Sequence, residues 1–207
     1  MTTDKPQLVV AGSRAWRGWL EKNHSSSEGI FLVLAKKGTM KPTSLTYAEA
    51  LEEALCFGWI DGQARSRDDA TFTQSFTPRR KRSPWSKRNT GIGERLVAEG
   101  RMHATGIAEM DRAKADGRWA AAYLGPATIE VPLELSAALA ARPKAKAKFA
   151  TLNSQNRYAI LYRIATAKRA ETRAKRITQF VDMLGRGETI YPQKAIGPAA
   201  SPLRGKR

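Results

Sequence analysis

The sequence is poor in the side chains that bind metals and form disulfides. One cysteine, Cys56, and two histidines, His24 and His103, are the whole supply in 207 residues. A single cysteine excludes an internal disulfide and a multi-cysteine metal site, and it fits a reducing compartment. The two histidines are too far apart in the sequence to form a metal-ligand motif. We therefore expect no metal site and no cofactor.

Long apolar runs and targeting signals are also missing. No apolar run approaches the ~18 residues that a membrane-spanning helix needs. The first ten residues lack the cationic segment and apolar stretch of a signal peptide. Neither a G-x-G-x-x-G sequence nor a Walker A loop occurs, so no nucleotide-cofactor motif is present. These absences predict a cytoplasmic protein without a transmembrane segment.

Acidic residues are scarce, and the excess of basic residues is concentrated. Lys and Arg number 36 against 19 Asp and Glu, which gives a net charge of +17. Residues 79–88 contain six basic side chains and no acidic one. Further basic stretches lie at 142–148, 163–176 and 194–207. Such charge favours salt-sensitive binding of polyanions, and it leaves nucleic acid, anionic lipid and acidic proteins open as partners.

Local patterns between residues 44 and 89 predict a helix followed by a β-hairpin. Thr46 and Glu49 have the spacing of a capping box, and Gly58 suits the end of that helix. Asp61-Gly62 is typical of a turn. The pattern then predicts two strands, at residues 63–67 and 70–77, joined at Asp68-Asp69. A two- or four-residue loop places Arg65 opposite Phe72, whereas a three-residue loop shifts the pairing by one residue.

The basic run after this hairpin is the best functional candidate. Ser83 or Ser86 is suited to cap the next helix. Trp85 either stacks on nucleic-acid bases or anchors that helix in the core. The candidate polyanion-binding residues are Arg65, Arg79, Arg80, Lys81, Arg82, Trp85, Lys87 and Arg88. A second basic face is predicted at Lys168, Arg169, Arg173 and Arg176.

Catalysis has only a weak candidate. Cys56 could act as a nucleophile with His24 or His103 as its base. However, Cys56 lies between Leu55 and Phe57 on the predicted helix, where a cysteine is usually a small buried hydrophobe. We therefore predict no catalytic residues and favour a protein that is not an enzyme.

The order of the predicted elements indicates an α+β fold. The apolar run at residues 30–35 predicts a central strand. We expect a small, mostly antiparallel sheet of three or four strands covered by helices, followed by a helical C-terminal part. The expected divisions are an α+β domain at 1–124, a linker at 125–132, a helical region at 133–187 and a mobile basic tail at 188–207.

Several motifs together resemble a known family. They are Leu45-Thr46-Tyr47, Glu49-Ala50-Leu51, Cys56 to Gly62, Phe76 to Lys81, Trp85-Ser86, Asn89, Glu99 to Met102, Ala113 to Trp119, Ala167-Lys168-Arg169, Glu171-Thr172-Arg173 and Arg176-Ile177. In this order, over roughly residues 8–185, the sequence resembles the YdeI/OmpD-associated family, also called bacteriocin-protection proteins. The resemblance implies protection against cationic antimicrobial peptides and, by the usual description, a periplasmic location. It implies no catalytic residues.

These observations lead to one main hypothesis and two alternatives. The main hypothesis is a non-enzymatic protein of stress or antimicrobial protection that binds a polyanion, with nucleic acid preferred, through its basic surface. The first alternative is a peripheral protein at an anionic membrane surface. The second is an enzyme acting on a phosphorylated or acidic small molecule. The sequence indicates no oligomeric state.

Overall fold

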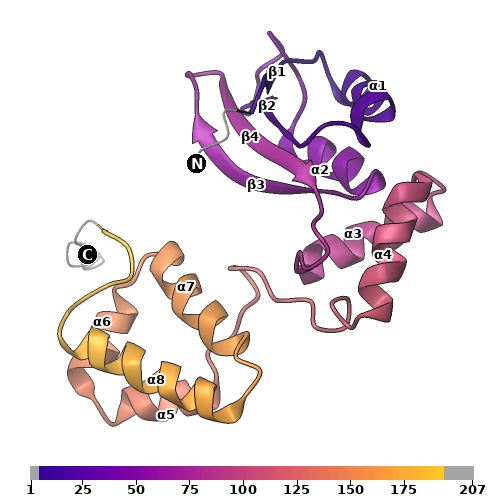
Figure 1. Ribbon diagram of the computed structural model, residues 1–207. Coiled ribbons are helices and arrows are strands. Elements are labelled where there is room, and N and C mark those ends of the chain that lie inside the picture. Colours follow the sequence, from indigo (N-terminus) through magenta and orange to yellow (C-terminus); the bar gives the residue numbers. More distant parts are fainter. Residues whose placement is uncertain (1–4, 194–207) are drawn as a thin grey trace, which may run out of the picture. The chain divides into compact units, whose positions relative to one another are not determined.

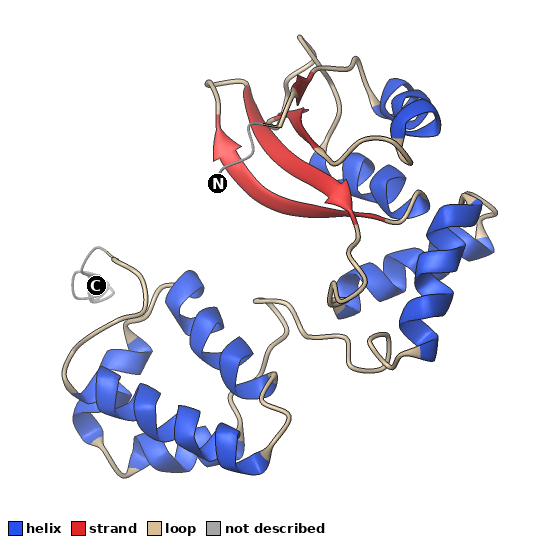
Figure 2. Ribbon diagram, viewed as in Figure 1, coloured by secondary structure: helices blue, strands red, loops and turns tan. Residues whose placement is uncertain are grey.

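The protein divides into two compact units. The computed structural model describes residues 5–193, and the chain divides between Ala122 and Tyr123. The N-terminal unit contains a sheet and four helices, and the C-terminal unit contains helices alone in its described part (Figures 1 and 2). The expected α+β fold with a helical C-terminal part is therefore confirmed.

A four-stranded mixed sheet forms the N-terminal unit's framework. Its strands lie in the order β1-β2-β4-β3, with β1 parallel to β2 and the other pairs antiparallel. The bounds are Gln7–Leu8 for β1, Ile30–Ala35 for β2, Trp59–Ser66 for β3 and Thr71–Pro78 for β4. The predicted central strand is β2, which is paired on both sides.

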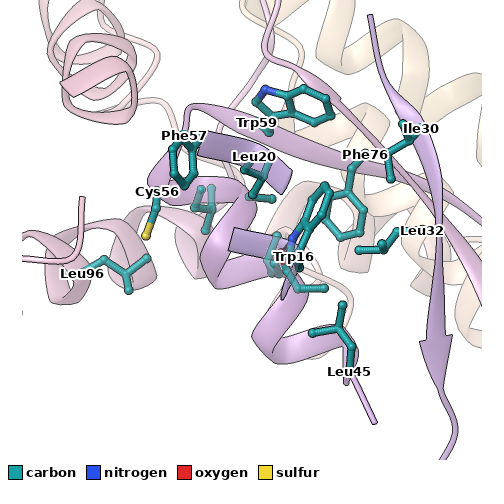
Figure 3. Close-up of a cluster of buried hydrophobic side chains, with 14 of the residues drawn as sticks. Trp16, Leu20, Ile30, Leu32, Leu45, Cys56, Phe57, Trp59, Phe76 and Leu96 are labelled. Carbon is teal, nitrogen blue, oxygen red and sulfur yellow. Dashed lines mark hydrogen bonds between the residues drawn. The ribbon is translucent and has the colours of Figure 1, made fainter. Parts of the chain in front are cut away.

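Helices cover one face of this sheet and bury a core rich in tryptophan. The bounds are Ser13–Asn23 for α1, Tyr47–Cys56 for α2, Lys87–Ala98 for α3 and Ala104–Ala115 for α4. Trp16 of α1 is fully buried, 5.8 Å from Phe76 between ring centroids (Figure 3). Ile30 and Leu32 of β2 belong to the same cluster. Their intervening neighbour Phe31 points to the opposite face because side chains alternate along a strand.

The predicted start and end of α2 are both confirmed. The Thr46 hydroxyl accepts a hydrogen bond from the Glu49 amide, and the Glu49 side chain accepts one from the Thr46 amide. Gly58 follows the helix at a positive φ of 75°, which only glycine adopts without strain. The chain then enters β3 through Trp59, which is buried.

The predicted hairpin exists, but the turn predicted before it is wrong. Asp61-Gly62 is not a turn: both residues lie within β3, where one extra residue between Asp61 and Ala64 forms a β-bulge. Ser66, rather than Arg65, lies opposite Phe72, so the register is that of the three-residue loop. Asp68 sets this loop, because its carboxylate accepts hydrogen bonds from the Ala70 and Thr71 amides.

The C-terminal unit is a bundle of four helices around a separate apolar core. The helices are α5 (Leu133–Ala140), α6 (Pro143–Ala150), α7 (Ser154–Ala165) and α8 (Ala170–Gly185). Leu135, Ile160, Ile164 and Leu184 are fully buried in it. The segment 125–132, expected as a linker, contributes Ile129 and Val131 to this core.

The first part of the expected tail is held against the helical bundle. The Tyr191 amide donates to the Asn156 side chain at 2.8 Å, and the Gln193 side chain accepts from the Asn153 amide at 3.1 Å. Ile190 packs against the bundle core. These contacts fix residues 190–193, and the remainder of the predicted tail, 194–207, lies outside the described residues.

Candidate polyanion-binding surface

The sheet face opposite the tryptophan core brings together side chains from three strands and the segment before β1. Phe31 on β2 pairs with Ser75 on β4, so both point to this face. The Arg65 guanidinium on β3 lies 4.2 Å from the centroid of the Phe31 ring. The Lys5 ammonium donates a hydrogen bond to the Ser75 hydroxyl at 3.0 Å and lies 6.0 Å from the Phe31 centroid.

These side chains line a hollow of about 340 Å³, which we call the basic groove. Its cationic lining consists of Lys5, Arg65 and Arg80. Phe31, Ser75 and Thr77 also line it. An adjoining hollow of about 390 Å³ shares Lys5, Thr77 and Arg80 with it. The groove is thus a concave surface with three positive charges over an aromatic ring.

Within the described part of the chain, the charge of the basic groove is uncompensated. Among residues 5–193, no carboxylate lies within ion-pair distance of Lys5, Arg65 or Arg80; the nearest acid to line either hollow is Glu28 in the adjoining one. The pKa of Lys5 is lowered, first by burial and then by repulsion from Arg80 and Arg65. Three cations that repel one another are stabilised by an anion placed between them.

Arg79 and Trp85 support the basic groove from within the core and do not line it, although Arg79 borders the adjoining hollow. Trp85 is 2 % exposed and packs against Trp119, with 4.8 Å between ring centroids. Arg79 is 7 % exposed; its guanidinium lies 3.6 Å from the Trp85 ring and donates to the Pro84 carbonyl. The hypothesis that Trp85 stacks on bases is therefore wrong, because the indole is covered by protein. It anchors the start of α3, the other alternative.

The remaining predicted cations of residues 79–88 are exposed. Lys81 and Arg82 lie in a turn that closes by a hydrogen bond from the Ser83 amide to the Arg80 carbonyl. Lys87 and Arg88 lie in the first turn of α3, where Ser86 is the N-cap. These four side chains flank the basic groove in sequence but do not line it.

The second predicted basic face belongs to the C-terminal unit. Lys168 and Arg169 are exposed just before α8. Arg173 lies 4.0 Å from the Glu134 carboxylate, and Arg176 donates to the Arg163 carbonyl. Two of the four cations therefore already have partners within their own unit.

The three residues weighed for catalysis do meet, around Phe57. The His24 and His103 rings lie 4.8 Å apart between centroids, and the His103 amide donates to the Cys56 carbonyl. The Cys56 side chain is fully buried, and burial, followed by the Glu53 charge, raises the pKa of its thiol. A buried thiol with a raised pKa is a poor nucleophile. Within the described residues, no group of three or more potential ligands is arranged to hold a metal ion.

Lys5 and Phe31 are among the groove residues that were not predicted. Phe31 lies in the apolar run Ile30–Ala35, which is typical of a strand buried on both faces, so no alternation marked it as a surface residue. Lys5 is an isolated cation whose proximity to Arg65 depends on the pairing of β1 with β2. No local pattern in the sequence indicates that contact.

Family comparisons divide the chain much as the structure does. Residues 8–109 match a domain of unknown function, DUF8412. Residues 128–187 match the family described as bacteriocin-protection, YdeI or OmpD-associated. The motifs of residues 45–89 lie in the first match, and those of residues 167–177 lie in the second. No curated protein and no solved structure matches the sequence.

In the part of the chain that the structure describes, no helix is long and apolar enough to cross a membrane.

The second match covers α5 to α8, so the helical bundle is the part of the molecule that the family model describes. Over residues 128–187, the chain is therefore similar to the family described as bacteriocin-protection, YdeI or OmpD-associated.

Proposed function

We propose that this protein binds a polyanion, nucleic acid in particular, through the basic groove and the exposed cations beside it. The observation that supports the proposal is the cluster of Lys5, Arg65 and Arg80 in a concave surface, which has no ion-pair partner among residues 5–193. Exposed Lys81, Arg82, Lys87 and Arg88 extend the positive charge along the chain. Phosphate contacts from Lys and Arg supply most of the sequence-independent affinity for nucleic acid.

The proposed role is non-enzymatic protection in the cytoplasm. With a net charge of +17, the protein repels cationic peptides, so it is not suited to capture them. Protection would act instead on the anionic target, by occupying phosphates that a cationic peptide would otherwise bind. This role accommodates both the family description of the C-terminal unit and the charge of the whole chain.

The test is fluorescence-anisotropy binding to single-stranded DNA, double-stranded DNA and RNA over a range of salt concentrations. The groove variant carries Lys5→Gln, Arg65→Gln and Arg80→Gln. A matched control carries Arg14→Gln, Lys22→Gln and Lys37→Gln, three exposed cations of the same unit for which no ion pair occurs among residues 5–193. Both variants lose three positive charges, so any difference between them reports position and not net charge.

We expect wild type to bind at low salt and to weaken as salt rises. The groove variant should bind single strands at least about tenfold more weakly, with its slope of log affinity against log salt smaller by about two. Equal losses in the groove variant and the control would indicate generic charge attraction and contradict the proposal. Binding to anionic vesicles with no binding to any nucleic acid would favour the membrane-surface alternative.

A further inference from the structure

The basic groove has features of a site for one nucleotide unit instead of a continuous track for a backbone. Its volume of about 340 Å³ lies at the lower end of small-molecule sites, which run from roughly 300 to 1,000 Å³. Its three cations converge on one hollow, whereas Lys81, Arg82, Lys87 and Arg88 do not line it.

The β-bulge shapes this hollow. The extra residue between Asp61 and Ala64 interrupts the pairing of β3 with β4, and Gly62 and Gln63 there line the groove. The Gly62 carbonyl is held by the Gln74 side chain at 2.7 Å, so the bulge is fixed. The Gln63 side chain is exposed and offers both a hydrogen-bond donor and an acceptor. Bulges of this kind often occur beside binding sites, where they redirect side chains.

The number of charges favours a particular form of phosphate. An internal phosphodiester carries one negative charge, whereas a terminal phosphomonoester carries about 1.5 to 2 at pH 7. Three cations that have no carboxylate partner among the described residues match the higher charge better. The Ser75 hydroxyl, which accepts from Lys5, retains its own proton to donate to a phosphate oxygen.

The aromatic floor supplies a second element of recognition. The Arg65 guanidinium lies over the Phe31 ring, so one planar face rests on protein. The half-exposed stack can accept a base on its outer side, because guanidinium planes stack on nucleobases as well as on aromatic rings. Phosphate and base recognition then occur within one hollow.

We propose that the basic groove binds the end of a nucleic-acid strand that carries a terminal phosphomonoester, with Lys5, Arg65 and Arg80 around the phosphate and the terminal base against Arg65. This inference rests on the proposed function and defines its preferred substrate as a phosphorylated single-strand end.

The test compares one short single-stranded DNA in three forms: with a 5′-phosphate, with a 3′-phosphate, and with hydroxyls at both ends. An internal fluorophore reports binding by anisotropy. We expect one phosphorylated form to bind about tenfold more tightly than the unphosphorylated form, as one extra charge-assisted contact would give. Lys5→Gln and Arg65→Gln should each abolish the preference. Lys37→Gln is the matched control, exposed and outside the groove, and should keep it.

Competition distinguishes a nucleotide end from a bare ion. Adenosine monophosphate should displace the phosphorylated strand at a concentration well below that needed with inorganic phosphate. Equal displacement by the two would show that only the ion is recognised and would overturn the inference. Salt-sensitive binding that is equal for all three strands would also overturn it while leaving the proposed function standing. If no strand binds at low salt, the proposed function itself fails.

Discussion

Arg79 and Arg80 are consecutive in the sequence, yet their guanidinium groups lie in different environments. Arg79 is buried against Trp85, and Arg80 is exposed at the edge of the basic groove. Both residues follow β4, which ends at Pro78: Arg79 is held inward by its contacts with Trp85 and Pro84, whereas Arg80 begins the exposed turn that the Ser83 amide closes. One residue of the basic run therefore stabilises the fold, and its neighbour is available to a ligand.

Arg79→Ala should destabilise the N-terminal unit. The change removes the cation–π contact with Trp85 and the hydrogen bond to Pro84, at a cost of about 2–3 kcal/mol in the free energy of unfolding. Urea unfolding followed by tryptophan fluorescence measures it. Arg82→Ala, an exposed member of the same run, is the control and should change stability by less than about 0.5 kcal/mol. An Arg79→Ala protein as stable as wild type would refute the supporting role.

Tyr47 makes the stability of the N-terminal unit depend on pH in the alkaline range. Its hydroxyl donates to the Asp61 carboxylate at 2.9 Å, and burial, with the Asp61 charge, raises its pKa from 10.0 to about 12. Above pH 10 the unfolded chain releases this proton first, so stability is complete below pH 10 and is lost as pH rises toward 12.

Tyr47→Phe should therefore be less stable than wild type at pH 8 by about 1 kcal/mol, the value of one hydrogen bond. The difference should shrink at pH 11, because wild type has then lost part of the contribution and the variant has none to lose. Urea unfolding at the two pH values measures both differences. A difference that stays constant would show that the hydroxyl does not titrate as described.

At the scale of elements, α4 approaches the end of α2 more closely than any side chain permits. A Cβ atom on Gly106 would lie 2.2 Å from the Cys56 carbonyl oxygen. Gly106→Ala should separate the two helices and lower the free energy of unfolding by about 3 kcal/mol. Gly91→Ala in α3 is the control, because nothing lies within 4 Å of its Cβ position. That change should stabilise the protein by about 0.5–1 kcal/mol through helix propensity. Thermal melting of both variants measures the two changes in stability. If both variants gained stability, or both lost it, the prediction would be contradicted.

Elements that depend on neighbouring residues were predictable, and those that depend on distant ones were not. The capping box of α2 is local, so Thr46 and Glu49 sufficed to place it. The hairpin was predicted, but its register depends on a three-residue loop that Asp68 stabilises, and the pattern allowed two-, three- and four-residue loops. The bulge in β3 has no sequence signal beyond Gly62, which suited a turn equally well.

The candidate site shows the same limit. Arg65 and Arg80 were identified from the concentration of charge. Their meeting with Lys5 at the groove is set by the order of strands in the sheet, which brings residues far apart in the sequence together. The sequence left two roles open for Trp85, base stacking and core packing. Its contact with Trp119 shows that it packs in the core.

At the scale of the whole molecule, the two units have separate apolar cores and should unfold separately. All five tryptophans lie in the N-terminal unit, so tryptophan fluorescence reports that unit alone, whereas circular dichroism reports both. Leu55→Ala should lower the midpoint of the fluorescence transition, at a cost of about 2–5 kcal/mol. Ile160→Ala should lower the midpoint of the circular-dichroism transition that belongs to the C-terminal unit. It should leave the midpoint of the fluorescence transition unchanged. A single transition shared by both probes and shifted by both variants would contradict this independence.

The position of Lys5 has a practical consequence for any laboratory that prepares this protein. Lys5 lies two residues before β1, so a tag fused shortly before it is tethered close to the groove that Lys5 lines. A polyhistidine tag there would add its own affinity for phosphate, and an acidic epitope tag would compete with the ligand. Binding assays should therefore use protein from which any such tag has been removed.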